Sequence, residues 1–246
     1  NSDRLFISEL LTVEEMREVC ALTGAGMETI YFSIAGNLDR LEDYIGEYRR
    51  ENFEPAAPRA MTVHGPYLNM DPATWDSMIY EVTMTRFGQA WRAAAALHAQ
   101  KLVFHTGFQS NVVFIRGWAE RAAAFFGDFM RRMDDQYRTE AARPGVLPEV
   151  VMENNYDPYP EPLLEVWERV GRDDFGICLD IGHAHCHGLV PAAKWAKVLL
   201  PALRHVHIHD NHGSRDESGL RDEHLALGEG TIPLEEVFGI LRTKPN

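Results

Sequence analysis

Short apolar runs alternate with longer amphipathic segments along the whole chain. The short runs have the length and the β-branched or aromatic content of strands. In the segments between them, apolar residues recur every three or four positions, which is the periodicity of a helix with one buried face. The seven predicted strands are Leu5–Ser8, Met27–Ile34, Ala60–His64, Lys101–His105, Val150–Glu153, Phe175–Asp180 and His205–His209.

The segments between the strands also carry the signals with which helices begin. Thr12 and Glu15 have the spacing of a capping box, which predicts a helix directly after the first strand. The aspartate–proline pair Asp71-Pro72 predicts the start of a long helix that reaches Gln100. The other predicted helices are Leu38–Arg50, Trp118–Tyr137, Pro162–Val170, Pro191–Leu200 and Ile232–Arg242.

Regular alternation of strand and helix predicts an α/β protein with a parallel sheet. Seven such units within 246 residues favour a closed (β/α)8 TIM barrel over an open sheet. An open dinucleotide-binding sheet would also carry a glycine-rich phosphate loop after its first strand, and this sequence has none there. Because no long linker or low-complexity segment interrupts the pattern, we predict a single domain over residues 1–246.

Composition narrows the classes of partner. Hydrophobic residues make up 45% of the chain, which is enough for a large core and argues against disorder. The net charge of −13 makes nucleic acid an unfavourable partner, because the field of the whole molecule repels phosphate groups. A small substrate that is held through a bound cation fits this charge better.

Cysteine spacing and hydropathy predict a cytoplasmic location. The three cysteines show no paired spacing, which indicates a reducing compartment. No apolar run is long enough to cross a membrane, and the first residues lack the pattern of a signal peptide. We therefore expect a cytoplasmic protein without a membrane partner.

Residues of the types that bind metals lie at the C-terminal ends of five successive predicted strands. In a parallel barrel these ends meet at one mouth, where the active site lies. Five neighbouring strands that each deliver an imidazole or a carboxylate to this mouth predict a shared cation. This mixture of ligands favours Zn²⁺, Mn²⁺, Fe²⁺ or Co²⁺ over Ca²⁺. The residues are His64, His105, Glu153, Asp180 with His183 just beyond it, and His207.

More ligand-type residues follow in the stretch that begins with the last predicted strand. His205, His207 and His209 alternate, so they are predicted to lie on one face of that strand. Asp222 and His224 lie in the polar loop after it, which indicates that this stretch supplies half of a metal site. Of the three histidines, His207 is the expected ligand. Residues expected to orient the ligands through hydrogen bonds are Asn154, His185, His209 and Asp210.

Six short motifs give the chain a resemblance to a known superfamily. In order, they are HGPYLNM at 64–70, FHTGF at 104–108, VMENN at 151–155, CLDIGHAH at 178–185, HIHDN at 207–211 and DEHLALGEGTI at 222–232. Together they resemble the xylose isomerase-like TIM barrels over roughly residues 5 to 242. This superfamily contains sugar isomerases and epimerases as well as endonuclease IV, and its members are often homo-oligomers.

The resemblance implies roles for particular residues. Glu153, Asp180 and His207 match the central metal ligands, and the carboxylate at the position of Glu153 also transfers a proton in the epimerases. His183 matches a residue that binds substrate in epimerases and a second metal in the endonuclease. Glu28 is a weak match to a glutamate on strand two. Residues that match further zinc ligands of the endonuclease are His64, His105, Asp222 and His224.

The family also supplies a glutamate from an eighth strand, as a ligand and as a partner acid or base. This sequence stops at Lys244-Pro245-Asn246, where that strand should begin. We therefore expect strand eight to be absent from this chain. Either the chain is truncated, or the site works without that carboxylate.

The residues and the resemblance together predict a metal-dependent isomerase or epimerase for a sugar or keto-polyol. Its cation, Mn²⁺ or Zn²⁺ with Co²⁺ or Fe²⁺ as alternatives, would stabilise an enediolate while Glu153 moves the proton and His183 polarises a substrate oxygen. The first alternative is a multinuclear zinc phosphodiesterase like endonuclease IV. Others are a sugar dehydratase or lyase using the same site, and a binding subunit completed by a partner chain.

Overall fold

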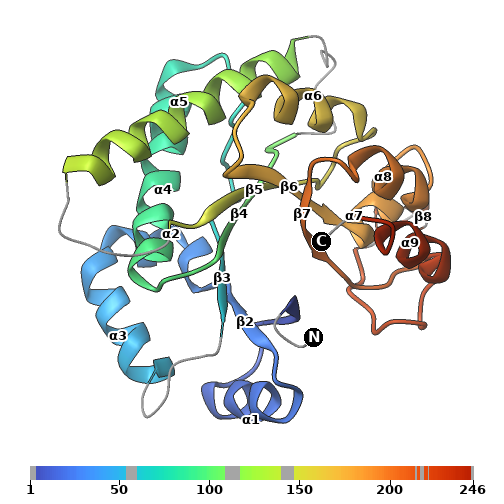
Figure 1. Ribbon diagram of the computed structural model, residues 1–246, viewed down its shortest axis with the longest axis horizontal. Coiled ribbons are helices and arrows are strands. Elements are labelled where there is room, and N and C mark those ends of the chain that lie inside the picture. The colour runs from blue at the N-terminus through green and yellow to red at the C-terminus, as the bar shows by residue number, and fades with distance from the viewer. Residues whose placement is uncertain are drawn as a thin grey trace. The chain divides into compact units, whose positions relative to one another are not determined.

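The computed structural model describes residues 4–53, 60–108, 117–139, 147–213, 215–216, 219–220 and 222–244. Within these residues, seven strands form one sheet in the order of the sequence (Figure 1). The pairs β1–β2, β2–β3, β3–β4 and β6–β7 run parallel, which confirms the predicted α/β class. The strands of this sheet are β1 (Phe6–Ser8), β2 (Gly26–Thr29), β3 (Met61–His64), β4 (Lys101–His105), β5 (Glu149–Glu153), β6 (Phe175–Asp180) and β7 (Leu203–His207).

Helices follow the strands as predicted, and none of the described helices is long and apolar enough to cross a membrane. A separate antiparallel pair, β8 (Arg215–Asp216) and β9 (Gly219–Leu220), lies in the loop after β7. The helices are α1 (Val13–Thr23), the 3₁₀ helix η2 (Tyr31–Ser33), α2 (Ala35–Asp39), α3 (Leu41–Phe53), α4 (Ser77–Ala96), α5 (Trp118–Thr139), α6 (Glu161–Val170), α7 (Ile181–Cys186), α8 (Ala192–Leu199) and α9 (Leu234–Leu241).

Helix α1 begins with the capping box that the sequence predicts. The backbone N–H of Thr12 donates to the Glu15 carboxylate at 2.9 Å, and the N–H of Glu15 donates to the Thr12 hydroxyl at 3.4 Å. The helix ends at Gly24, whose φ of 69° lies in the left-handed region that glycine adopts without strain.

Two elements of the first third differ from their predicted extents. The predicted strand Met27–Ile34 is shorter, because the chain leaves the sheet after Thr29. The Thr29 hydroxyl accepts the N–H of Tyr31, and η2 follows. The predicted helix Leu38–Arg50 is two helices, α2 and α3, because Arg40 between them has a non-helical backbone (φ −122°, ψ 45°).

Helix α4 begins five residues later than Asp71-Pro72 predicts. The Asp71 carboxylate accepts the N–H of Ala73 at 2.9 Å and so closes a turn, not a helix. Asp76 is the actual N-cap, because its carboxylate accepts the N–H groups of both Met78 and Ile79.

The last strand of the main sheet also differs from the prediction. The predicted strand His205–His209 ends at His207 in the structure, so His209 lies beyond the sheet. The short helix α7, which follows Asp180 directly, was not predicted. Its six residues are too few to show helical periodicity in the sequence.

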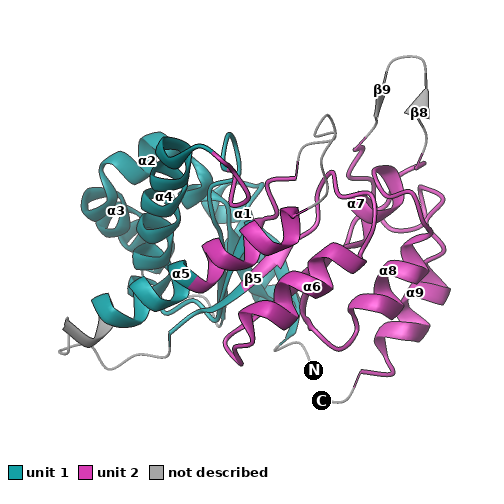
Figure 2. Ribbon diagram, turned by 90° about the horizontal axis from the view of Figure 1, so that it is seen from above, with its two compact units in different colours: residues 1–70, 76–104, 128–150 teal, residues 71–75, 105–127, 151–246 magenta. Residues whose placement is uncertain are grey.

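The chain divides into two compact units (Figure 2). Unit 1 contains residues 1–70, 76–104 and 128–150, and unit 2 contains residues 71–75, 105–127 and 151–246. In unit 1, the rings of Phe87 and Phe104 stack at 3.7 Å, and the ring of Phe129 meets both at its edge. In unit 2, Phe126 packs against Phe175 at 5.1 Å. The single domain over residues 1–246 stays a prediction.

The capping box of α1 gives a direct test of this local structure. Thr12→Ala removes the hydroxyl that accepts the N–H of Glu15, and we expect the free energy of unfolding to fall by about 1 kcal/mol. Thr12→Ser keeps an acceptor and should retain most of that stability. Urea unfolding of both variants measures the difference, and equal losses in the two would contradict the role of the cap.

Candidate metal centre

Two carboxylates lie side by side at the ends of neighbouring strands in unit 2. Glu153 ends β5 and Asp180 ends β6, and their exposed fractions are only 1% and 2%. The side chain of Asn154 joins the two ends. Its amide oxygen accepts the N–H of Asp180 and its amide nitrogen donates to the Asp180 carbonyl, both at 2.9 Å. Parallel strands therefore deliver both acids to one place, and Asn154 fixes their register.

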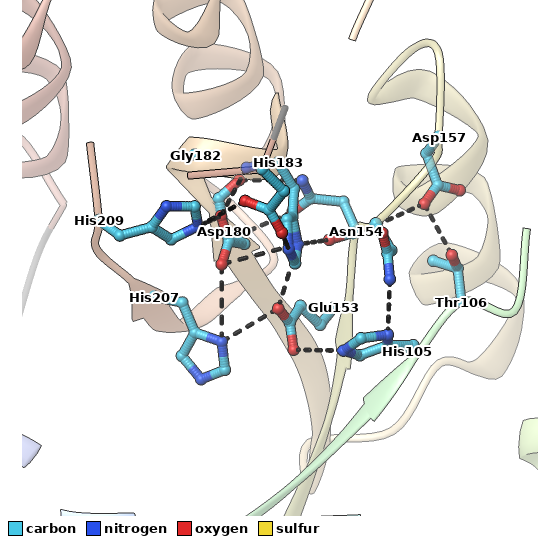
Figure 3. Close-up of polar contacts among 12 residues, drawn as sticks. His105, Thr106, Glu153, Asn154, Asp157, Asp180, Gly182, His183, His207 and His209 are labelled. Atoms are coloured by element: carbon cyan, nitrogen blue, oxygen red, sulfur yellow. Dashed lines mark hydrogen bonds and ion pairs between the residues drawn. The ribbon is translucent and has the colours of Figure 1, made fainter. Parts of the chain in front are cut away.

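Three imidazoles surround the Glu153 carboxylate (Figure 3). Nδ1 of His207 lies 3.0 Å from Oε1, and Nδ1 of His183 lies 3.4 Å from the same oxygen. Nε2 of His105 lies 3.4 Å from Oε2. Burial alone would raise the pKa of Glu153, but His207 and His105 outweigh it and hold the pKa well below its usual value. Glu153 is therefore an ionised carboxylate in a buried environment.

Asp180 links the strand end to helix α7. Its Oδ1 accepts the N–H of His183 at 2.7 Å and so caps the helix, and Nε2 of His209 lies 3.1 Å from the same oxygen. Burial opposes the ionisation of Asp180, yet His183 and His209 lower its pKa. Burial also opposes the protonation of His183, but Asp180, Asp222 and Glu153 raise its pKa well above the usual value.

A second group of ligand-type side chains lies on the other side of His183. We call His183, His209, Asp222 and His224 the outer cluster, and Glu153, Asp180 and His207 the inner cluster. In the outer cluster, Asp222 Oδ2 lies 2.9 Å from Nε2 of His224 and 3.2 Å from Nε2 of His183. One ligand atom from each of the four residues lies within 4.8 Å of the others. Burial raises the pKa of Asp222, but His183 and His224 outweigh it and lower the pKa.

Asp210, which follows shortly after the end of β7, holds the loop that carries Asp222 and His224 through hydrogen bonds. The backbones of Asp210 and Leu225 exchange two hydrogen bonds, at 2.9 and 2.8 Å. The Asp210 carboxylate also accepts the N–H groups of Asn211, Gly228 and Ile232. Because Leu225 directly follows His224, this fastening brings His224 to the outer cluster.

His105 is held by the residues that follow β5. The amide nitrogen of Asn155 lies 2.8 Å from Nδ1 of His105. With that nitrogen as the donor, Nδ1 accepts and the ring proton lies on Nε2, which faces Glu153. Oδ2 of the buried Asp157 accepts both the N–H of Asn155 and the hydroxyl of Thr106, at 2.9 and 2.7 Å. Asp157 thus positions the neighbours of His105 on both strands.

The structure brings seven of the eight predicted site residues together in unit 2. The eighth, His64, ends β3 in unit 1, where its Nδ1 lies 3.0 Å from the Gly65 carbonyl, and its role as a ligand stays a prediction. Glu28, also in unit 1, accepts the hydroxyl of Thr62 at 2.7 Å. The seven residues in unit 2 are His105, Glu153, Asp180, His183, His207, Asp222 and His224.

One residue has a larger role in this site than the sequence predicts. His209 was expected only to orient other ligands, yet it is buried within the outer cluster and contacts Asp180. The alternation of histidines along 205–209 is the signal in the sequence, but it predicts a strand up to His209, whereas β7 ends at His207. The other expected orienting residues take different places: Asn154 and Asp210 support the site as described, and His185 Nε2 lies 3.0 Å from the Thr231 hydroxyl.

The donor groups fit a divalent cation. Two fully buried carboxylates lie next to each other, and burying such a pair is costly unless positive charge compensates it. Nδ1 of His209 is buried and has no hydrogen-bond partner among the residues that the structure describes. Imidazole nitrogens with carboxylate oxygens form the donor set that Zn²⁺, Mn²⁺, Fe²⁺ and Co²⁺ prefer.

The sequence of the chain also matches a known protein family. The model of the xylose isomerase-like TIM barrel family matches residues 21–245. The chain belongs to this family. Membership agrees with the sequence order of the strands and with the ligand-type residues at the strand ends.

Known proteins similar to this chain include an uncharacterised relative and two solved structures. Protein MJ1311 of Methanocaldococcus jannaschii is 27% identical over 190 residues, which are 74% of this chain but only 60% of the relative. The TTHB071 protein of Thermus thermophilus, from a crystal soaked with ZnCl₂, is 25% identical with a TM-score of 0.72, covering 95% of this chain and 85% of that one. A D-tagatose 3-epimerase-like protein has 22% identity and a TM-score of 0.68, covering 97% and 86% of the two chains.

Asp157 makes the stability of the protein depend on pH. Burial raises the pKa of Asp157 from 3.8 to about 6, although hydrogen bonds from Thr106 and Asn155 oppose the rise. Between about pH 4 and pH 6 the folded protein therefore holds a proton that the unfolded chain has released, and stability falls as pH rises through this window. Above it, the ionised carboxylate costs about 3 kcal/mol.

We expect Asp157→Asn to be as stable as the wild type or more stable at pH 7.5, and to lose this pH dependence. Both donors bind one oxygen of Asp157, which the amide oxygen of asparagine can replace. Asp157→Ala is the control, and it should be less stable than the asparagine variant because both donors lose their acceptor. Unfolding is measured at several pH values from 4 to 8; an unchanged difference between Asn variant and wild type across this range would refute the buried titration.

Proposed function

We propose that this protein is a divalent-metal-dependent isomerase or epimerase of a sugar or keto-polyol, and that it moves a proton at the carbon next to the substrate carbonyl. The observation that carries the proposal is the inner cluster: a buried, ionised Glu153 whose oxygens lie 3.0–3.4 Å from three imidazoles. Family membership and the epimerase-like structural neighbour support it.

Each residue of the site has a proposed task. Glu153, Asp180 and His207 would hold the cation, which supplies a Lewis acid for the carbonyl and thereby acidifies the neighbouring C–H bond. Glu153 takes the proton as a carboxylate, and the N–H at Nε2 of His105 orients that carboxylate through Oε2. His183 directs Nε2 away from Glu153, where it can meet a substrate oxygen. The substrate is a small molecule, and assembly into a homo-oligomer stays a prediction.

A second candidate function is a multinuclear phosphodiesterase like endonuclease IV. The outer cluster favours it, because an isomerase needs one cation and these four residues offer a place for another. The net charge of −13 opposes it, since DNA would have to approach a strongly acidic molecule. We therefore place it second.

Exchange of hydrogen with solvent tests the first proposal. With Mn²⁺, Zn²⁺ or Co²⁺ supplied in D₂O, we expect deuterium to enter one or more members of a panel of ketoses and aldoses next to the carbonyl. Glu153→Gln should slow this exchange by roughly 10²–10⁴-fold, because the amide cannot accept the proton. The matched control is Glu149→Gln at the other end of β5, where the carboxylate pairs with Lys101; it should exchange at the wild-type rate.

Other results of these experiments would assign a different reaction to the site. No exchange with any sugar and any of the three cations, together with nicking of abasic-site DNA at low salt, would replace the proposal by the phosphodiesterase. Exchange accompanied by loss of water from the substrate would assign the same site to a dehydratase. Mass spectrometry of the products distinguishes these results.

A further inference from the structure

We infer that Arg121 binds an anionic group of the substrate, so that the protein acts on sugar phosphates or sugar acids in preference to neutral sugars. Arg121 lies in the first turn of α5, and its guanidinium rests on the exposed ring of Trp75. The inference rests on the proposed isomerase or epimerase function and adds a substrate class to it. The residues proposed to bind the cation take no part in this contact.

The turn that precedes α4 holds the guanidinium of Arg121 in two ways. The central carbon of the guanidinium lies 3.8 Å from the centroid of the Trp75 ring, which is the contact of a cation with an aromatic face. Nε of Arg121 donates a hydrogen bond to the carbonyl oxygen of Ala73 at 2.6 Å. These contacts fix the plane of the guanidinium before a ligand arrives, which lowers the entropy cost of binding.

The outer edge of the same guanidinium, formed by Nη1 and Nη2, is left for a ligand. Among the residues that the structure describes, none forms an ion pair with Arg121. On the same helix, by contrast, Arg131 and Arg132 each lie 3.0 Å from a carboxylate oxygen of Asp128. Gly117 leaves space beside Nη1, because a Cβ at this position would lie 3.2 Å from that nitrogen. Two N–H groups along one edge of a guanidinium match two oxygens of a phosphate or a carboxylate.

Asp71 belongs to the turn that holds the guanidinium. Its carboxylate accepts the N–H of Ala73 at 2.9 Å, and Ala73 is also the residue whose carbonyl oxygen receives Nε of Arg121. Burial raises the pKa of Asp71, whereas the N–H of Ala73 and the charge of Arg121 lower it. Asp71 therefore senses the arginine, and an anionic ligand of Arg121 has to approach against its negative charge.

The contact of Arg121 with Trp75 lies within unit 2, which also contains the inner cluster (Figure 2). Trp75 lies in the loop between β3 and α4, and Arg121 lies at the start of the helix that follows β4. Loops and helix starts that follow parallel strands lie at the carboxyl edge of the sheet, where His105 ends β4. Arg121 is therefore placed to hold one end of a substrate whose carbonyl lies at the inner cluster, and this binding energy positions the reacting carbon.

Hydrogen exchange with charged and neutral sugars tests the substrate class. Each ketose of the panel is compared with its phosphorylated form and with the keto acid of the same length, and we expect a lower KM for one of the two anionic forms. Arg121→Gln should raise that KM by roughly 10–100-fold and leave kcat and the KM of the neutral sugar unchanged. Asp71→Asn, which keeps an acceptor for Ala73 but removes the negative charge, should lower the same KM.

A purely structural role of Arg121 predicts a different result. If Arg121 only held the turn at 71–75, Arg121→Gln would alter the kinetics of anionic and neutral sugars alike. Arg121→Lys, which keeps the charge but not the planar edge, should have an intermediate KM for the anionic sugar. The matched control is Arg131→Gln, which removes the same charge from an exposed position of α5 and should behave as the wild type. Circular dichroism establishes that all variants are folded.

Tryptophan fluorescence tests anion binding without turnover. Titration of the metal-loaded full chain with inorganic phosphate or acetate should give a saturable change that persists in Arg131→Gln. This change should disappear in Arg121→Gln and in Trp75→Phe, which assigns it to the Trp75 ring. Because this readout needs no sugar, a protein without sugar exchange can still bind the anion at Arg121.

Three results would overturn the inference. The first is an equal KM for anionic and neutral sugars in the wild type, which would leave the proposed reaction intact but without an anionic substrate. The second is a fluorescence response to phosphate and acetate that is the same in Arg121→Gln as in the wild type. The third is Arg121-dependent binding of DNA without any response to phosphate or acetate, which would assign Arg121 to a nucleic-acid backbone.

Discussion

The rest of the site depends on the burial of two neighbouring carboxylates. Glu153 and Asp180 lie at the ends of β5 and β6, almost wholly removed from water, where like charges would repel strongly. Parallel strands place them together, so the fold itself creates this unfavourable pair, and only positive charge can compensate it. The surrounding histidines, protonated or bound to a cation, meet that need. The pair is therefore evidence of function, because an apolar pair would stabilise the same strand ends better.

The parts of this arrangement that follow from local sequence could be predicted. Strands such as Lys101–His105 and Phe175–Asp180 are continuous apolar runs because both faces of a parallel sheet are covered, and their observed bounds are those predicted. A carboxylate or imidazole that ends such a run must lie at the carboxyl edge of the sheet, so His105, Glu153 and Asp180 could be assigned to the site from their positions alone.

The parts that depend on contacts distant in sequence could not be predicted. His209 looked like the end of a strand, and only the pairing of Asp210 with Leu225 shows that the chain has already left the sheet. Asp71 and Asp76 both look like helix caps, and the choice between them depends on which one closes a turn instead. Local residue types indicate which chemistry a segment can perform, whereas tertiary hydrogen bonds decide which residue performs it.

His183 connects the inner and the outer cluster, because its two ring nitrogens face different clusters. Nδ1 lies 2.9 Å from the carbonyl oxygen of Asn154, which can only accept, so this nitrogen carries a proton. When the ring is neutral, its lone pair is on Nε2, which faces Asp222. This lone pair can meet either a hydroxyl of a substrate or a cation of the outer cluster, but not both at once. His105 can give a proton to a substrate at the inner cluster whichever role His183 takes, because the proton-bearing Nε2 of its ring faces Glu153.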